Sequence, residues 1–132
     1  MTIFEVQTLK QDKMKKGYLI NVTTKEITEV EVGDYKSIQK IIGCDLFDVV
    51  NIDRKNDLYI DDEGLLSVNE SSKFFGFKNS NVKLAGNGLV LGINQNTGNS
   101  VNTTLTLEWL KEQIEFYNFE EMKDYLIRVG ML

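Results

Sequence analysis

Apolar and polar positions alternate along much of the chain, and the alternation predicts short strands. Residues 17–22 form a short apolar run, and residues 27–32 alternate between apolar and mostly acidic positions, which is the period of a half-buried strand. The polar residues 23–26 separate the two runs, so the sequence predicts a β-hairpin. Its inner side is expected to carry Ile27, Val30 and Val32.

Two further runs predict a second pair of strands. Residues 46–52 are rich in β-branched side chains, residues 58–60 are apolar, and the polar residues between them suit a turn. Residues 67–81 are polar apart from the aromatic insert Phe74-Phe75-Gly76-Phe77. We interpret them as a loop that the phenylalanines pin to the core, and the alternative is an aromatic platform for a planar ligand.

The stretch from Val82 to Ile93 is apolar at both ends and carries Gly86-Asn87-Gly88 near its middle. It predicts a central strand, most clearly over residues 89–93, because these residues form an uninterrupted apolar run. The glycines do not have the fixed spacing of a dinucleotide-binding motif or a P-loop. We therefore attribute them to backbone geometry.

Helical spacing occurs in three places. Residues 35–42 predict a helix with Asp34 as its N-cap and Gly43 as its C-cap, because Asp accepts from free N–H groups and Gly adopts the left-handed conformation. A second helix is predicted from 107 to about 117, with Thr106 as N-cap. Asn118 and Glu121 have the spacing of a capping box that starts a last helix. The first helix is expected to bury Tyr35, Ile38, Ile41 and Ile42.

These elements predict an α+β fold: a small mixed, mainly antiparallel sheet with one internal helix and two C-terminal helices. The length of 132 residues indicates a single domain. Within it, residues 1–14 are interpreted as an N-terminal extension or edge strand, residues 15–117 as the core, and residues 118–132 as the C-terminal helix.

The composition argues against most kinds of catalysis. The chain has no histidine and one cysteine, Cys44, so Ser-His-Asp and Cys-His arrangements cannot form and a zinc site is not expected. The carboxylates between Asp53 and Glu63 lack the spacing of a calcium loop and suit turns instead. We therefore expect a protein that is not an enzyme and has no cofactor and no metal.

Charge and hydropathy limit the partners and the compartment. The net charge of −5 argues against non-specific nucleic-acid binding, and the apolar runs are too short to cross a membrane. The first residues lack the basic and apolar regions of a secretory signal. A single cysteine suits a reducing compartment, so we expect the protein in the cytoplasm.

The uncharged loop over residues 94–104 is the best candidate for a binding site. It is rich in amide and hydroxyl groups and runs into the N-terminus of a predicted helix, where backbone N–H groups favour anions. The alternative is a mobile connection. Phe75 or Phe77 is expected to stack on a base, and Lys83 or Lys73 to meet a phosphate. The expected hydrogen-bonding residues are Asn87, Asn94, Asn96, Thr97, Asn99 and Thr104.

Several segments together resemble a known family, domain of unknown function 3846. They are residues 17–32, Asp34-Tyr35, residues 61–64, the segment Gly86-Asn87-Gly88-Leu89-Val90-Leu91-Gly92, and residues 105–108. The resemblance covers roughly residues 15–115, and the glycine-containing segment is its most specific part. It implies no catalytic residues. It implies a setting, namely small accessory proteins of bacteriophages and plasmids in Gram-positive hosts.

We therefore expect a non-enzymatic phage or mobile-element accessory protein that binds a small nucleotide-like ligand. In the bacterial cytoplasm it would sequester a host immune signal, and we expect a homo-oligomer. The alternative is a protein–protein inhibitor or adaptor acting on a host defence protein, through an acidic face or by edge addition of the N-terminal strand. An enzyme that uses carboxylate, Lys or Tyr chemistry ranks third.

Overall fold

The computed structural model describes residues 14–132, and the extension or edge strand predicted over residues 1–14 lies outside them apart from Met14. The first half of the chain forms β1 (Lys15–Asn21), β2 (Glu26–Val32), α2 (Tyr35–Ile42), β3 (Phe47–Asp53), β4 (Asn56–Asp61) and the 3₁₀ helix η1 (Gly64–Ser67). The second half forms β5 (Lys73–Phe77), β6 (Lys83–Ala85), β7 (Gly88–Ile93), β8 (Ser100–Val101), α3 (Leu107–Gln113), β9 (Ile114–Asn118) and α4 (Phe119–Arg128). The predicted α+β fold with one internal and two C-terminal helices is confirmed.

The larger of two sheets has the strand order β2-β1-β7-β4-β3, and β8 pairs with the later half of β7. Each of these pairings is antiparallel. The two predicted strand pairs are confirmed as β1–β2 and β3–β4. The predicted inner side of β2 is wrong in part, because Ile27 and Val32 belong to different core clusters. They point to opposite faces, and a hydrophobic core cluster lies on each face of this sheet.

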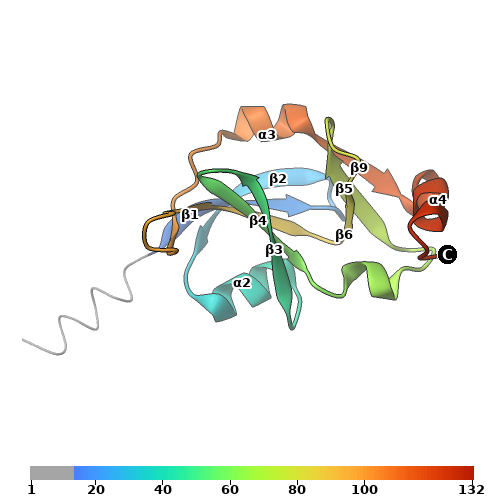
Figure 1. Ribbon diagram of the computed structural model, residues 1–132, viewed down its shortest axis with the longest axis horizontal. Helices are drawn as coiled ribbons and strands as arrows, with labels where there is room; N and C mark the ends of the chain where they lie inside the picture. Colours follow the sequence, from blue (N-terminus) through green and yellow to red (C-terminus); the bar gives the residue numbers. More distant parts are fainter. Residues whose placement is uncertain (1–13) are drawn as a thin grey trace, which may run out of the picture.

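Helices α2 and α3 lie on opposite sides of the larger sheet (Figure 1). Under α2, Ile38 and Ile42 pack against Leu89 and Leu91 of β7. Tyr35 does not join them as predicted: its side chain is 53% exposed, because it lies in the first turn of α2 at the rim of the sheet. The predicted helix caps are confirmed for α2, α3 and α4.

A second, three-stranded sheet has the order β6-β5-β9. Its existence corrects two predictions. Residues 73–77, interpreted as part of a loop, form the central strand β5, and the helix expected to reach residue 117 ends at Gln113, after which the chain continues as β9. Phe75 lies opposite Phe116 in the β5–β9 pairing.

The stretch over residues 82–93 is two strands, and they belong to different sheets. The buried strand predicted over residues 89–93 is confirmed as β7, whereas β6 joins the small sheet. Gly86, with φ +82°, and Asn87 form the turn between them. The Asn87 side-chain oxygen accepts a hydrogen bond from the Val22 N–H at 3.0 Å, which ties this turn to the end of β1.

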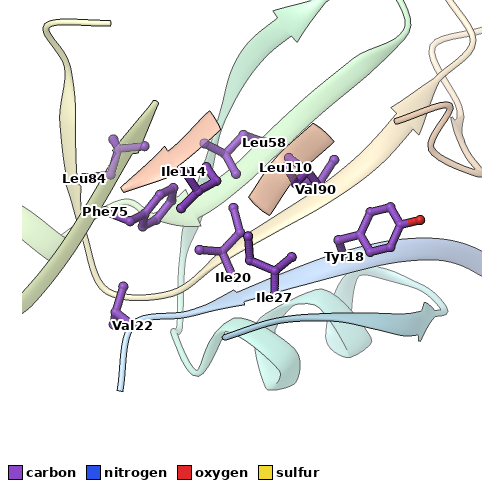
Figure 2. Close-up of a cluster of buried hydrophobic side chains, with 10 residues drawn as sticks. All are labelled: Tyr18, Ile20, Val22, Ile27, Leu58, Phe75, Leu84, Val90, Leu110 and Ile114. Carbon is purple, nitrogen blue, oxygen red and sulfur yellow. The ribbon is translucent and has the colours of Figure 1, made fainter. Parts of the chain in front are cut away.

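The two sheets share one hydrophobic core. Phe75, Leu84 and Ile114 from the small sheet meet Ile20 and Leu58 from the large sheet (Figure 2). A pocket lined by residues of both sheets, including Val50 of β3 and Leu84 of β6, lies beside this core. Within residues 14–132, no helix has the length and apolar character needed to cross a bilayer.

Candidate functional site

The predicted binding loop is a tight connection between β7 and β8. The Asn94 side-chain oxygen accepts from the N–H of Asn96 at 3.0 Å, and the Thr97 hydroxyl accepts from the N–H of Asn99 at 3.2 Å. The N–H of Asn94 donates to the Asn99 carbonyl at 2.9 Å. The side chains of Asn94 and Thr97 therefore stabilise the turn itself, and the loop is exposed.

Three other predicted polar residues also have structural partners. Thr104 accepts a hydrogen bond from the Asn56 side-chain amide at 2.8 Å, and Asn87 holds the turn described above. The Lys83 ammonium lies 3.1 Å from the Tyr117 hydroxyl and 4.6 Å from the centre of its ring. Each of these contacts lies in a different part of the molecule.

The predicted stacking residues lie on β5, beside Lys83 of the paired strand β6. Phe75 is completely buried in the shared core, so its ring has no surface on which a base can stack in this structure. Phe77 is half-buried, and its ring centre lies 6.4 Å from that of Trp109. The predicted residues are therefore not brought together into one site.

A groove on the α2 side of the large sheet is a better candidate, and we name it the α2 groove. Its volume is about 1030 Å³, at the upper end of the range for small-molecule sites. It includes Asn99 from the predicted set. Its lining residues are Lys15, Gly33, Asp34, Tyr35, Ile38, Phe47, Val49, Tyr59, Asn99, Ser100 and Val101.

Three aromatic rings form a row along this groove. The ring centres of Tyr35 and Phe47 are 4.7 Å apart, and those of Phe47 and Tyr59 are 5.4 Å apart. Tyr59 shares a hydrogen bond with the Ser100 hydroxyl at 3.1 Å. The sequence did not indicate this row, because Tyr35 fell on the expected buried face of a helix and the other two rings lie on separate strands.

The charged groups of the groove are few. The Lys15 ammonium donates to the Gly33 carbonyl over a long 3.4 Å, and the Asp34 carboxylate accepts from the N–H of Ser37 as the cap of α2. A surface with aromatic rings, amide and hydroxyl groups and one ammonium can hold a planar polar molecule. Nowhere in residues 14–132 do three or more carboxylate, thiol or imidazole groups gather as metal ligands would.

A second pocket lies on the opposite face of β3, and we name it the α3 pocket. Its volume is about 400 Å³. Phe77 and Trp109 form one wall and Leu58 belongs to the other. The full lining is Val50, Asn51, Ile52, Leu58, Phe77, Asn79, Ser80, Val82, Leu84, Trp109 and Gln113.

Cys44 lies outside both cavities, after the C-cap of α2, and its side chain is half-buried. Burial raises the pKa of its thiol, and the nearby carboxylates of Asp61 and Asp45 raise it further. A thiol with a raised pKa stays protonated at neutral pH, and the thiolate is the nucleophilic form. Cys44 is therefore poorly suited to act as a nucleophile.

Comparisons with known proteins gave one match. No curated protein matches the chain, and no solved structure matches it. The model of one family matches residues 14–115, a range that contains both walls of the α2 groove and leaves out α4. The match covers more than half of the chain, so the protein belongs to the family described as Domain of unknown function (DUF3846).

Proposed function

We propose that the protein is a non-catalytic binding protein that holds a planar, nucleotide-like small molecule in the α2 groove. The observation that carries this proposal is the aromatic row of Tyr35, Phe47 and Tyr59 in an open groove. Tyr35 is exposed in this groove, and exposed aromatic surface in a groove marks a candidate ligand site that a flat ligand would cover.

Stacking would supply most of the binding energy. Tyr35 is exposed over about half of its surface (53%), so a base can lie against it, while the tilted ring of Phe47 packs against it with ring centres 4.7 Å apart. Stacking of a base on an aromatic side chain is worth roughly 1–3 kcal/mol. Tyr35 is thus the first residue to test.

Polar groups at the rim would orient the ligand. Asn99 and Ser100 offer amide and hydroxyl groups on one side of the rings, and Lys15 offers a positive charge. The 3.4 Å hydrogen bond from Lys15 to the Gly33 carbonyl is long and therefore weak. A phosphate oxygen can take the place of this carbonyl as the acceptor for the Lys15 ammonium.

We propose binding without turnover, since the chain has no histidine to move protons near neutral pH. The biological role that we propose is sequestration of a nucleotide-derived host immune signal in the cytoplasm, by an accessory protein of a phage or mobile element. This role follows from the setting that the family resemblance implies.

Isothermal calorimetry against a panel of cyclic nucleotides and ADP-ribose derivatives tests the proposal. At least one ligand should bind, and Tyr35→Ala should weaken it about tenfold, or about 1.4 kcal/mol. Trp109→Ala is the matched control, because Trp109 lines the α3 pocket on the other face of β3. Absence of heat from every panel member would overturn the proposal, and chromatography of the ligand after incubation would reveal turnover. Sedimentation of the same samples measures the homo-oligomer that we expect.

Inhibition of a host defence protein, or an adaptor role on one, is the second candidate function. The edge strand β3 favours it, because Val49 and Val50 are exposed there on the two faces of the sheet. Stoichiometric retention of one host protein by the immobilised chain, lost in a Val50→Asp variant, would support this candidate.

A further inference from the structure

The outer edge of β3 presents backbone groups that point away from its neighbour β4. The N–H of Asp62 donates to the carbonyl of Leu46 at 3.1 Å, and hydrogen-bonded positions alternate along an antiparallel pair. The backbone groups of Asp48 and Val50 therefore face β4, whereas those of Val49 and its alternate neighbours face outward. Within residues 14–132, no strand pairs with this outer edge.

One outward N–H is occupied by a local side chain. The Asp48 carboxylate accepts from the N–H of Val49 at 2.8 Å. Such a contact satisfies an edge donor within the chain. A strand that docked here would take over the Val49 N–H and release the Asp48 carboxylate, which would then need a positively charged partner.

The faces of β3 are unusually apolar for an edge strand. Val49 is 44% exposed and Val50 is 38% exposed, although edges are commonly protected by charged side chains. Val50 lines the α3 pocket beside Trp109, which is itself 38% exposed. A pocket of about 400 Å³ with an apolar floor accommodates one large apolar side chain that approaches along β3.

Charge at the start of β3 indicates the character of the partner. Between Lys40 and Arg54 the chain has acidic residues and no basic ones, and the end of β4 lies alongside with further carboxylates. A second copy of the chain would bring its own Asp48 and Asp53 to this edge, where like charges repel. A segment with Lys or Arg is complementary.

We propose that β3 accepts an extended peptide segment of a partner protein as an additional strand. One large apolar side chain of that segment enters the α3 pocket opposite Val50, and a Lys or Arg two residues away meets the Asp48 carboxylate. Backbone hydrogen bonds supply affinity and the pocket supplies selectivity, as in other cases of strand addition. The inference goes beyond ligand binding in the α2 groove. It rests on the second candidate function, to which it gives a site.

The probe is a set of labelled synthetic peptides of about seven residues that are rich in Thr and Val. Each peptide carries one Phe, Leu or Trp to enter the α3 pocket. A Lys two positions before or after that residue is placed to meet the Asp48 carboxylate. Fluorescence anisotropy on the full chain should show binding by at least one peptide. The same peptide, N-methylated on the backbone so that it cannot donate to β3, should lose at least tenfold in affinity. This test uses the unaltered protein and needs no variant to fold.

Two valine variants locate the site. Val50→Asp should weaken the best peptide at least tenfold, whereas Val101→Asp, the matched change in the α2 groove, should leave it unchanged. Nucleotide affinity should fall in Val101→Asp and stay unchanged in Val50→Asp. Failure of one proposal is therefore distinguishable from failure of the other. The inference is overturned if no peptide binds or if N-methylation has no effect on peptide affinity. It is also overturned if Val50→Asp converts a dimer of the protein to a monomer, because the occupant of the β3 edge would then be a second copy of the chain.

Discussion

Asn56 is fully buried, and both polar atoms of its side chain have partners. Its amide nitrogen donates to the Asp53 carboxylate at 3.0 Å and to the Thr104 hydroxyl at 2.8 Å. Its oxygen accepts from the Thr103 hydroxyl at 2.6 Å and from the Thr104 N–H at 3.1 Å. One side chain thus joins the start of β4 to the segment that leads into α3. A buried amide is stable in such a place because all its hydrogen bonds are made.

Replacement of Asn56 by Ala should lower the free energy of unfolding by about 2–4 kcal/mol, because Thr103 and Thr104 lose a buried acceptor. Urea titration followed by circular dichroism measures the change. Asn96→Ala is the control, since Asn96 is exposed in the β7–β8 turn, and it should change stability by no more than about 0.5 kcal/mol. Similar losses in both variants would contradict the assigned role.

Cys44 should react slowly with iodoacetamide, because its raised pKa lowers the thiolate fraction at any pH below that pKa. The rate should rise with pH, with a midpoint above that of the same chain unfolded in urea. Asp61→Asn removes one of the causes and should shift the midpoint downward, whereas Asp48→Asn, which removes a carboxylate not among those causes, should leave it in place. Mass spectrometry of the alkylated protein measures the rate. A folded-state midpoint below the unfolded one would be incompatible with this account.

At the scale of elements, local signals were sufficient for the helix starts. Asp34 accepts from the N–H of Ser37, Thr106 accepts from that of Trp109, and Asn118 forms a capping box with Glu121. A capping hydrogen bond joins residues three positions apart, so the local sequence is enough to predict where a helix starts. These three starts were predicted correctly.

The small sheet could not be predicted because its strands depend on distant pairing. The chain passes from α3 into β9 without Gly, and the apolar residues there suit a helix as well as a strand. The pairing of Phe75 with Phe116 decides the outcome, and the two residues are far apart in the sequence. The same reason explains why β5 was interpreted as a loop.

Gly92→Ala should lower the free energy of unfolding by about 1–3 kcal/mol, which is the usual cost of overpacking. An added Cβ would lie 2.2 Å from the Asn102 carbonyl oxygen, and this oxygen belongs to the backbone beside β8, so it cannot move without disturbing the β7–β8 pairing. Gly33→Ala is the matched control, because its Cβ would lie 3.4 Å from the nearest atom, the sulfur of Met14. Melting temperatures from thermal unfolding distinguish the two variants. Equal melting temperatures for the two variants would refute the steric argument.

At the scale of the whole molecule, the α2 groove collects side chains from five elements and loops between Lys15 and Val101. Five of the predicted residues lie within residues 94–104, because neighbours in sequence are visible without a fold. Asn99 is the predicted residue that the groove retains. The aromatic row depends on the β3–β4 register, in which Val49 lies opposite Tyr59, and no local pattern encodes that register.

The shared core also predicts how the molecule unfolds. Because Phe75, Leu84 and Ile114 of the small sheet pack on Ile20 and Leu58 of the large one, neither sheet can open alone without exposing the buried faces of both (Figure 2). Urea unfolding should therefore be a single transition, with the same midpoint by Trp fluorescence and by far-ultraviolet circular dichroism.

Phe75→Leu tests this coupling, since it removes volume from the small sheet alone. It should lower stability by about 1–3 kcal/mol and should speed hydrogen exchange equally at the amides of β5 and of β7, because both exchange through the same global opening. Ile127→Ala, at an exposed position of α4, is the control and should leave both unchanged. If β5 exchanged faster while β7 kept its protection, the sheets would be separate cooperative units. Equal acceleration would show that packing across the two sheets makes them one folding unit, to which the hydrogen bond from the Val22 N–H to Asn87 adds a link between the β6–β7 turn and the end of β1.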